Sequence, residues 1–288
     1  MSKRKKLRKL IRAKGIVVLP GVYDCLSAKL AEEAGFKAVL VTGAGVVASI
    51  LGYPDFGLIT MTEVLNQTRS IARSVDIPVF ADCDTGYGNP INVFRTVREF
   101  ESAGVAGLFI EDQIFPKRCG HFEKKLLISK EEMVKKIEAA VDARTDPDLI
   151  LMARTDARAV YGLDAAIERA EAYVAAGADM IFVEAPQSVD ELKRIPKSVK
   201  VPTMANMVEG GKTPLVSIRD LEEMGFKFAS FSGSAQKIAI AAMRDLFKTL
   251  KDTGRLDSIL DRIVSLDDRS RLLGLPKLYT MEEKYGVR

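Results

Sequence analysis

The chain has 288 residues, of which 47% are hydrophobic and 28% charged, and its net charge is +4. This length suits one large α/β barrel or two average domains, and the composition is ordinary for a soluble globular protein. So small a charge argues against a nucleic-acid partner, and no secretory or membrane-spanning stretch is evident. Three cysteines at unrelated spacings indicate reduced thiols, so we expect a cytoplasmic protein with no membrane partner.

The first predicted element is a helix over about residues 2–14. The basic run Ser2-Lys3-Arg4-Lys5-Lys6 is followed by Leu7, Leu10 and Ile11 at helical spacing, and the pattern stops at Gly15. A solvated basic face on an amphipathic helix explains this charge run without a partner.

Eight short apolar segments follow, and the residues that precede them are of two alternating kinds. Four of them come after a helix that a glycine terminates, at residues 38–41, 106–110, 180–183 and 228–231. Three others follow a proline or an acidic turn, at residues 77–81, 148–153 and 201–205. With residues 16–19 at the start, the pattern predicts eight buried strands separated by helices.

Strands that alternate with helices pair in parallel, because right-handed crossovers need a helix between them. The count of eight favours an α/β fold of the (β/α)8 TIM type over an open sheet, with residues 1–288 as one domain. Beyond the eighth strand, residues 235–251 predict a helix closed at Gly254. The tail over about 255–288 carries Leu256, Ile259, Leu260 and Ile263 on one face, so we expect it to pack on another subunit.

Polar residues follow nearly every predicted strand. Because all strands of a parallel barrel end at one face, these residues should meet there, and that face carries the active site in barrel enzymes. Helix capping explains one or two of them but not a whole ring. The main members of the ring are Thr42, Gly43, Ala44, Asp82, Asp84, Glu111, Arg154, Glu184, Asn206 and Ser234.

Three carboxylates of this ring predict a metal site. Asp82, Asp84 and Glu111 come from adjacent strands, and like charges so close need a cation or a proton. Oxygen ligands without histidine favour Mg²⁺, or Mn²⁺, over zinc. The alternative is that Asp82 and Asp84 are only turn residues around Gly86 and Gly88.

The only histidine of the chain lies in the segment Lys117-Arg118-Cys119-Gly120-His121. A thiol beside an imidazole or a cation can ionise near neutral pH, which predicts a reactive Cys119 on a mobile loop. The alternative is a set of solvated loop charges with an incidental cysteine, but the polar ring favours reactivity. Residues 115–126 have little apolar area and ample charge, so we expect this loop to close over an anionic ligand.

Two further motifs suggest nucleotide chemistry only weakly. Gly43-Ala44-Gly45-Val46-Val47-Ala48 matches the dinucleotide pattern G-x-G-x-x-A, but a lone match is weak. Gly210-Gly211-Lys212-Thr213 resembles the end of a phosphate loop, yet Asn206 stands where that loop needs its first glycine. We reject both motifs as nucleotide sites.

Several segments, spread over nearly the whole chain, carry a family resemblance. They are residues 42–45, Gly52-Tyr53-Pro54-Asp55, residues 82–88, Ile110-Glu111-Asp112-Gln113, residues 117–121, residues 153–157 and Ala205-Asn206. Together they resemble the isocitrate lyase and phosphoenolpyruvate mutase superfamily, in its methylisocitrate lyase-like branch. The resemblance implies a barrel whose last helix is exchanged between subunits, a homotetramer, and Mg²⁺ with a 2-oxo acid or its enolate in the site.

The resemblance also implies a reaction, the cleavage of a 2-hydroxy di- or tricarboxylate of the 2-methylisocitrate type into a 2-oxo acid such as pyruvate and a succinate-like acid. Cys119 would protonate the carbanion, and the base for the hydroxyl is left open between Asp55 and a metal-bound oxygen. The catalytic candidates are Cys119, His121, Lys117, Arg154, Glu184 and Asp55, and the candidates for binding the small carboxylate substrate are Thr42, Gly43, Ala44, Gly120, Asn206 and Ser234.

The chain departs from the family pattern at two places. Thr42 replaces a usual serine, and residues 231–237 read Phe-Ser-Gly-Ser-Ala-Gln-Lys where methylisocitrate lyases have Pro-Leu-Ser-Ala and a nearby arginine. A dicarboxylate such as 2,3-dimethylmalate is therefore an alternative substrate. Carboxyphosphonoenolpyruvate or phosphoenolpyruvate mutase activity, oxaloacetate decarboxylation and a non-catalytic barrel also remain as alternatives.

Overall fold

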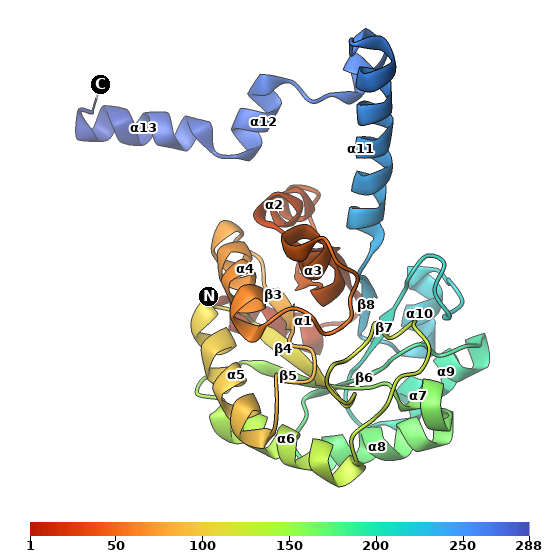
Figure 1. Cartoon of the computed structure of the whole chain (residues 1–288). Helices are drawn as coiled ribbons and strands as arrows, with labels where there is room; N and C mark the ends of the chain where they lie inside the picture. The colour runs from red at the N-terminus through yellow and green to blue at the C-terminus, as the bar shows by residue number, and fades with distance from the viewer. Residues whose placement is uncertain (288) are drawn as a thin grey trace. The chain divides into compact units, whose positions relative to one another are not determined.

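The barrel predicted from the sequence is present. The computed structural model describes residues 1–287, and eight parallel strands close into one barrel in chain order (Figure 1). The strands are β1 (Val17–Val22), β2 (Val39–Val41), β3 (Val79–Asp82), β4 (Gly107–Glu111), β5 (Ile150–Thr155), β6 (Met180–Val183), β7 (Thr203–Asn206) and β8 (Phe228–Phe231). All eight predicted strands are confirmed.

The strand boundaries differ from the prediction in one systematic way. Strands β3 and β7 begin just after Pro78 and Pro202, because proline has no N–H to donate to a sheet ladder. Several strands also run farther than the apolar pattern, so that Asp82, Glu111 and Asn206 are the last residues of β3, β4 and β7. The strands themselves thus fix the position of these polar residues.

Helices on the outside of the barrel connect successive strands. They are α2 (Cys25–Glu33), α3 (Gly43–Leu51), α4 (Met61–Ser74), α5 (Pro90–Ala103), α6 (Lys130–Ala143), α7 (Ala157–Tyr161), α8 (Leu163–Ala175), α9 (Val189–Ser198) and α10 (Ile218–Met224). Gly104 and Gly225 end α5 and α10 at φ +95° and +104°, a conformation that other residues rarely adopt. A glycine in this conformation ends the helix shortly before the next strand, so these glycines predicted where the strands begin.

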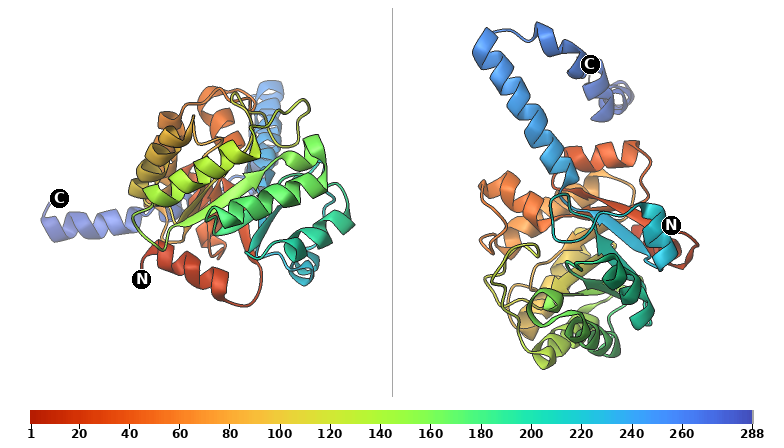
Figure 2. Two further views of the ribbon diagram at one scale, coloured as in Figure 1. Left: turned by 90° about the horizontal axis from the view of Figure 1, so that it is seen from below. Right: turned by 90° about the vertical axis from the view of Figure 1, so that its right-hand side faces the viewer.

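One end of the barrel is sealed by apolar side chains. Helix α1 (Lys3–Arg12) places Leu7, which is 0% exposed, against a cluster that includes Leu19, Phe80 and Phe228 from the strands. Figure 2 (left) shows α1 at the end of the barrel opposite the loop that follows β4. This leaves the other end, where the strands terminate, for a site.

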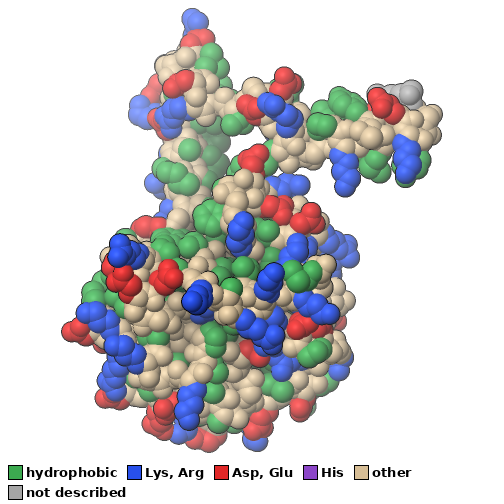
Figure 3. Space-filling model, turned by 180° about the vertical axis from the view of Figure 1, so that it is seen from behind, with side chains coloured by type: hydrophobic (Ala, Val, Ile, Leu, Met, Phe, Trp, Pro, Cys, Tyr) green, Lys and Arg blue, Asp and Glu red, His purple; other side chains and the backbone are tan. Residues whose placement is uncertain are grey.

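The chain divides into two compact units, the first ending at Gln236 and the second beginning at Lys237. Helix α11 (Ser234–Thr253), a 3₁₀ turn η1 (Asp257–Arg262), α12 (Leu266–Leu272) and α13 (Leu275–Tyr285) make up the C-terminal part, and none of their described residues is buried. The helix expected at 235–251 is confirmed, whereas Leu260 lies in a 3₁₀ turn rather than on an α-helical face. Figure 3 shows hydrophobic side chains exposed on these helices. No helix among residues 1–287 is long and apolar enough to cross a membrane.

Candidate active site

The loop between β4 and α6 folds back over the carboxyl ends of the strands. Its two arms pair near the base, where the Ile114 amide donates to the Leu126 carbonyl at 2.8 Å and the Ile128 amide donates to Asp112 at 3.0 Å. The side chain of Gln113 bonds both the amide and the carbonyl of Arg118, at 3.0 and 2.8 Å. The loop that carries Cys119 is thus an ordered lid, which we define as residues 112–129.

Lys117 fastens one side of the lid to the barrel. Its ammonium, on a side chain only 2% exposed, lies 2.7 Å from Oδ1 of Asp55 and 2.7 Å from Oδ1 of Asp84. Burial alone would lower the pKa of Lys117, but Asp84 and Asp55 raise it well above its ordinary value. Lys117 is therefore a fixed positive charge, and it joins two of the carboxylates predicted for the site.

The segment that carries Asp55 packs tightly against the same part of the lid. The Asp55 carbonyl accepts from the Cys119 amide at 3.1 Å. Gly57 has φ +68°, and a Cβ at this position would lie 2.8 Å from the Lys117 nitrogen and 2.9 Å from Pro116. The two segments therefore touch backbone to backbone, which only glycine permits here.

Lys125 fastens the other side of the lid, and the sequence analysis gave it no such role. This side chain is 6% exposed, and its ammonium donates to Asp156 Oδ1 at 3.0 Å and to the Gly120 carbonyl. Lysines in a charged loop are expected to face solvent. No local signal distinguishes Lys125 from its exposed neighbour Lys124, since the difference arises only from the buried Asp156 beneath the lid.

Arg154 lies beneath the lid among three carboxylates. Its guanidinium is 2.9 Å from Asp156, 3.2 Å from Glu111 and 3.2 Å from Glu184. A Cβ on Gly120 would come within 2.6 Å of this guanidinium and within 2.4 Å of Glu184, so the lid backbone touches both side chains. The structure thus brings Arg154, Glu111, Glu184 and Gly120 together, as the sequence predicted.

Cys119 is a neutral thiol in this environment. Burial raises its pKa to about 11, although the His121 backbone amide opposes the shift, and Asp55 and Glu184 add to it. The pKa of this thiol is thus shifted away from ionisation, and the reactivity predicted for Cys119 stays a prediction. A thiol that keeps its proton has the chemistry of a weak acid rather than that of a nucleophile.

His121 is also neutral. Burial lowers the pKa of its imidazole, and the opposing effect of Glu184 does not compensate. Nδ1 accepts a hydrogen bond from the Lys212 amide at 3.1 Å, and Nε2 lies 3.6 Å from Glu184 Oε1. The imidazole is thus fixed between the lid and the barrel.

Asn206 has its amide oriented by two hydroxyl groups. Ser230 and Ser232 both donate to its Oδ1, at 2.9 and 3.0 Å, which leaves the amide nitrogen to donate elsewhere. The hydroxyl of Ser234, another predicted binding residue, instead donates to Glu209. Two hydroxyls therefore fix the orientation of the Asn206 amide, whereas the side chain of Ser234 is engaged.

The start of α3 lies beside the predicted metal carboxylates. The Gly43 amide donates to Asp82 Oδ2 at 3.2 Å, and a Cβ on Gly43 would lie 3.3 Å from Asp84 Oδ1. Thr42 caps the helix without a side-chain hydrogen bond, and Ala44 follows in its first turn. The predicted binding backbone thus adjoins Asp82 and Asp84.

The three carboxylates do not by themselves form a cage for a metal. Among residues 1–287 no group of three or more His, Cys, Asp or Glu side chains is arranged to hold an ion, so the closed cluster expected from the sequence does not occur. Mg²⁺, however, usually keeps several waters and needs only one or two carboxylates. The site must therefore be judged by the oxygen atoms it offers.

Those oxygen atoms fit a divalent cation. Both oxygens of the buried Glu111 lack a hydrogen-bond partner, although Arg154 forms an ion pair with Oε2. Burial raises the pKa of Glu111 well above its ordinary value, and burial raises that of Asp84 to about 6 against the pull of Lys117. Carboxylate oxygens that lack hydrogen-bond donors are suitable ligands for a hard cation.

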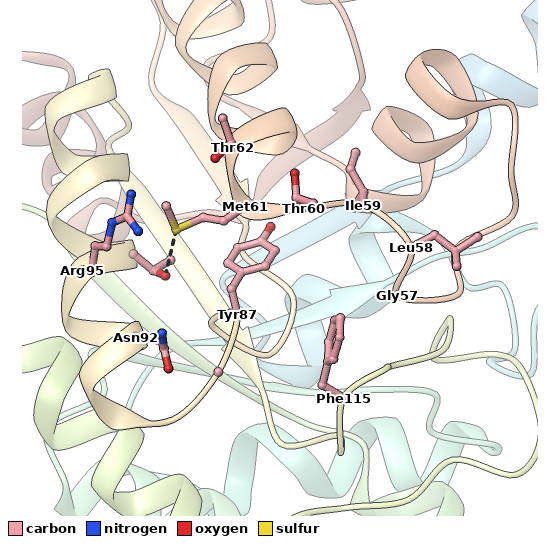
Figure 4. A pocket seen from close by; sticks show the side chains of 12 residues that line it. Gly57, Leu58, Ile59, Thr60, Met61, Thr62, Tyr87, Asn92, Arg95 and Phe115 are labelled. Atoms are coloured by element: carbon pink, nitrogen blue, oxygen red, sulfur yellow. Dashed lines mark hydrogen bonds between the residues drawn. The ribbon is translucent and has the colours of Figure 1, made fainter.

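A cavity of about 400 Å³ lies next to the site, at the start of α4 and α5 (Figure 4). Gly57, Met61, Tyr87 and Phe115 are among the residues that line it, and Thr96 donates to the Met61 sulfur at 3.4 Å. None of the candidate catalytic residues lines this cavity. Because Gly57 and Phe115 belong to the segments that carry Asp55 and Lys117, the cavity adjoins these segments.

Comparison with known proteins agrees with this arrangement. Residues 7–251 match the family model described as phosphoenolpyruvate phosphomutase, and the chain belongs to this family. Within the superfamily of isocitrate lyase and phosphoenolpyruvate mutase, it lies in the methylisocitrate lyase-like branch, so that resemblance is confirmed.

Two relatives and one solved structure are similar to the chain over most of its length. It is 46% identical to 2,3-dimethylmalate lyase of Eubacterium barkeri over 100% of this chain and 99% of the relative. It is 46% identical to 2-methylisocitrate lyase of Aeropyrum pernix over 93% and 86%. A phosphonopyruvate hydrolase in complex with oxalate and Mg²⁺ superposes with a TM-score of 0.90 at 31% identity, over 99% of both chains. The two relatives are thus lyases, the family model is that of a mutase, and the superposed structure is a hydrolase.

Proposed function

We propose that this protein is a lyase that cleaves the C–C bond between C2 and C3 of a 2-hydroxy acid with a carboxylate on C3. The observation that carries the proposal is Cys119, a thiol kept protonated by burial and held by the lid over the barrel end. A weak acid at that place is suited to deliver a proton to a carbanion. The relatives named as lyases support the same reaction.

The proton and electron balance of the reaction needs one base and one acid. Asp55, paired with Lys117 at 2.7 Å, accepts the proton of the substrate hydroxyl. The C2–C3 bond breaks, the C–O bond becomes the carbonyl of a 2-oxo acid, and the electron pair moves onto C3 and its carboxylate. Cys119 then gives its proton to C3 and becomes a thiolate, and exchange with solvent resets both groups.

The other groups bind and orient the two halves of the substrate. The Asn206 amide nitrogen donates to one carboxylate of the substrate. The guanidinium of Arg154, which carboxylates of the protein hold in place, provides a fixed positive charge for the other carboxylate of the substrate. Asp82, Asp84 and Glu111 would hold Mg²⁺, or Mn²⁺, which when bound supplies positive charge for the oxygen of the developing 2-oxo acid. The lid excludes water from the carbanion.

We propose a dicarboxylate of the 2,3-dimethylmalate type as the substrate in preference to a tricarboxylate. A third carboxylate needs another cationic partner, but the basic side chains between β7 and β8 are engaged elsewhere. Lys212 pairs with Glu123, Arg219 with Glu223, and Lys227 with the Ala13 carbonyl. The first relative named above acts, by its name, on such a dicarboxylate.

The test is a screen of 2-hydroxy di- and tricarboxylates for release of a 2-oxo acid in the presence of Mg²⁺. We expect the highest kcat/KM with 2,3-dimethylmalate and lower values with 2-methylisocitrate, while Cys119→Ser should cleave both about a hundredfold or more slowly. Faster turnover of the tricarboxylate would contradict the preference for a dicarboxylate. Turnover of a phosphonate or decarboxylation of oxaloacetate that survives Cys119→Ser would instead indicate mutase or decarboxylase chemistry.

We also propose that the protein is a homotetramer that exchanges its last barrel helix between subunits. Helix α11 has 20 residues and none of them is buried, while Ile238, Met243, Phe247 and Leu250 expose large apolar side chains. Large apolar side chains left exposed in this number favour association. Sedimentation of the wild type and of Phe247→Glu tests this, since a wild-type monomer would contradict it.

The cysteines support the cytoplasm as the proposed compartment. Cys25, Cys83 and Cys119 are all free thiols. An oxidising compartment would select for disulfide pairs. Recovery of the native protein in an oxidising compartment after cell fractionation would contradict this proposal.

A further inference from the structure

The loop between β7 and α10 contains Gly210-Gly211-Lys212-Thr213, the motif that the sequence analysis rejected as a phosphate loop. In the structure this segment lies against the lid and contacts His121. Two side chains also join the segments, because the ammonium of Lys212 pairs with the exposed carboxylate of Glu123. The motif is therefore part of the closed site, in a role that nucleotide binding does not explain.

The backbone of this loop determines which nitrogen of His121 is protonated. The Lys212 amide donates to His121 Nδ1 at 3.1 Å. An imidazole nitrogen accepts a hydrogen bond only when it carries no proton, so in the neutral ring the proton must be on Nε2.

Gly211 makes this approach of the backbone possible. A Cβ on Gly211 would lie 2.8 Å from both Cε1 and Nδ1 of His121, and 3.0 Å from the Val208 carbonyl. Real Cβ atoms do not approach other atoms so closely. Any side chain larger than hydrogen at residue 211 would displace the imidazole from the Lys212 amide.

The Nε2–H group faces the centre of the site without a partner. Nε2 is buried and lacks a hydrogen bond within residues 1–287, and it lies 3.6 Å from Glu184 Oε1. That oxygen already accepts from the Ala185 amide at 2.9 Å, and the other oxygen of Glu184 pairs with Arg154 at 3.2 Å. A buried donor left unpaired is costly and marks a place where a ligand acceptor gains affinity.

We propose that residues 208–213 are a positioning element for catalysis. Because Gly211 has no side chain, the Lys212 amide can reach His121 and hold it as the Nε2–H tautomer. This hydrogen bond also orients the Nε2–H group toward the substrate. The donor then meets a substrate carboxylate beside Glu184 and Arg154 when the lid is closed. Gly211 and Lys212 thus act through His121 rather than on the substrate. The effect on turnover rests on the proposed function, whereas the tautomer does not.

The tautomer can be measured directly, because His121 is the only histidine of the chain. Protein labelled with ¹⁵N-histidine and prepared without a histidine tag gives one pair of ring nitrogen signals. In the ligand-free wild type above pH 7.5, we expect Nδ1 to be unprotonated and Nε2 to carry the proton. A signal pair from the Nδ1–H form, or the averaged pair of a free imidazole, would overturn the proposal even if the protein cleaves no C–C bond.

Gly211→Ala tests the coupling to catalysis, and Glu123→Gln is its matched control. Gly211→Ala should shift the ring signals toward the averaged pair and lower kcat/KM about tenfold or more, because both the binding and the orientation of the substrate carboxylate suffer. Glu123→Gln removes only the exposed ion pair between the same two segments, so its tautomer and its kcat/KM should match those of the wild type. An unchanged tautomer in Gly211→Ala, or an equal loss of kcat/KM in Glu123→Gln, would overturn the proposal.

Discussion

The two ends of the barrel are stabilised in opposite ways. At the amino end, Leu7 of α1 covers an apolar cluster in which Phe80 and Phe228 pack with ring centroids 6.3 Å apart. At the carboxyl end, the side chains are buried charges that compensate one another in pairs, such as Lys117 with Asp55 and Lys125 with Asp156. Apolar area stabilises a fold without regard to pH, whereas buried ion pairs are weak evidence for stability. The amino end of the barrel therefore contributes mainly to stability, whereas the carboxyl end holds the candidate site.

The ring of Phe182 lies at the border between these two regions. It belongs to the apolar cluster inside the barrel, where it meets Phe109 edge to face at 5.9 Å. The guanidinium of Arg154 lies 5.2 Å from the centroid of the same ring. A single layer of side chains thus separates the apolar interior from the charged site, so substitutions on either side should have separable effects.

The largest effect should come from Cys119→Ser at the carboxyl end. A serine hydroxyl is a far weaker acid than a thiol, so we expect cleavage to fall by about two or more orders of magnitude. The melting temperature and Mg²⁺ binding should stay near those of the wild type. Near-normal cleavage, measured as release of the 2-oxo acid, would remove Cys119 from its role.

At the amino end, Leu7→Ala should affect stability and spare catalysis. Loss of a fully buried leucine side chain costs about 3 kcal/mol in the free energy of unfolding, because it leaves a cavity in the cluster. Denaturant unfolding checks this, with Leu215→Ala, at an exposed leucine, as the control. If kcat per folded molecule fell together with stability, the two ends would not be independent.

Lys125→Met should have a smaller effect, confined to the lid. Without its ion pair to Asp156 the lid opens more often, and we expect kcat to fall about tenfold while the unfolding midpoint hardly changes. Proteolysis within residues 115–126 should become faster, and bound ligand should slow it less than in the wild type. Lys124→Met is the matched control because Lys124 is the exposed neighbour. Equal effects of the two substitutions would show that the buried ion pair does not close the lid.

The smallest effect concerns pH. Burial raises the pKa of Cys119 to about 11, and in the proposed mechanism the active form is the protonated thiol. Cysteine-dependent activity should therefore persist as pH rises through 8.5, where a free thiol ionises, and decline only as pH approaches the raised pKa. The pH profile of kcat/KM and the rate of thiol alkylation both test this. Rapid alkylation near pH 8 would indicate the thiolate instead.

The sequence predicted the barrel because its signals are local. A glycine that ends a helix and an apolar run after it define each strand without knowledge of the rest of the chain. The ring of polar residues followed, since parallel strands must bring residues such as Asp82 and Glu111 to one face.

What the sequence did not predict depends on contacts between distant segments. Lys125 becomes buried only because Asp156, 31 residues away, lies beneath the lid. The protonated state of Cys119 depends on the depth of its burial, which its charged neighbours in the sequence do not reveal. The role of Gly211 is invisible until the lid places His121 beside it, 90 residues from it in the chain.

The close approach at Gly57 limits how this protein can diversify. Because a side chain at residue 57 would collide with the backbone of Lys117, any larger residue there would separate the two segments that carry Asp55 and Cys119. New substrate preferences are therefore expected to arise by mutation elsewhere, such as at Ser234 after β8. A saturation library over residues 57 and 234 should return active variants with several residues at 234 and almost exclusively glycine at residue 57.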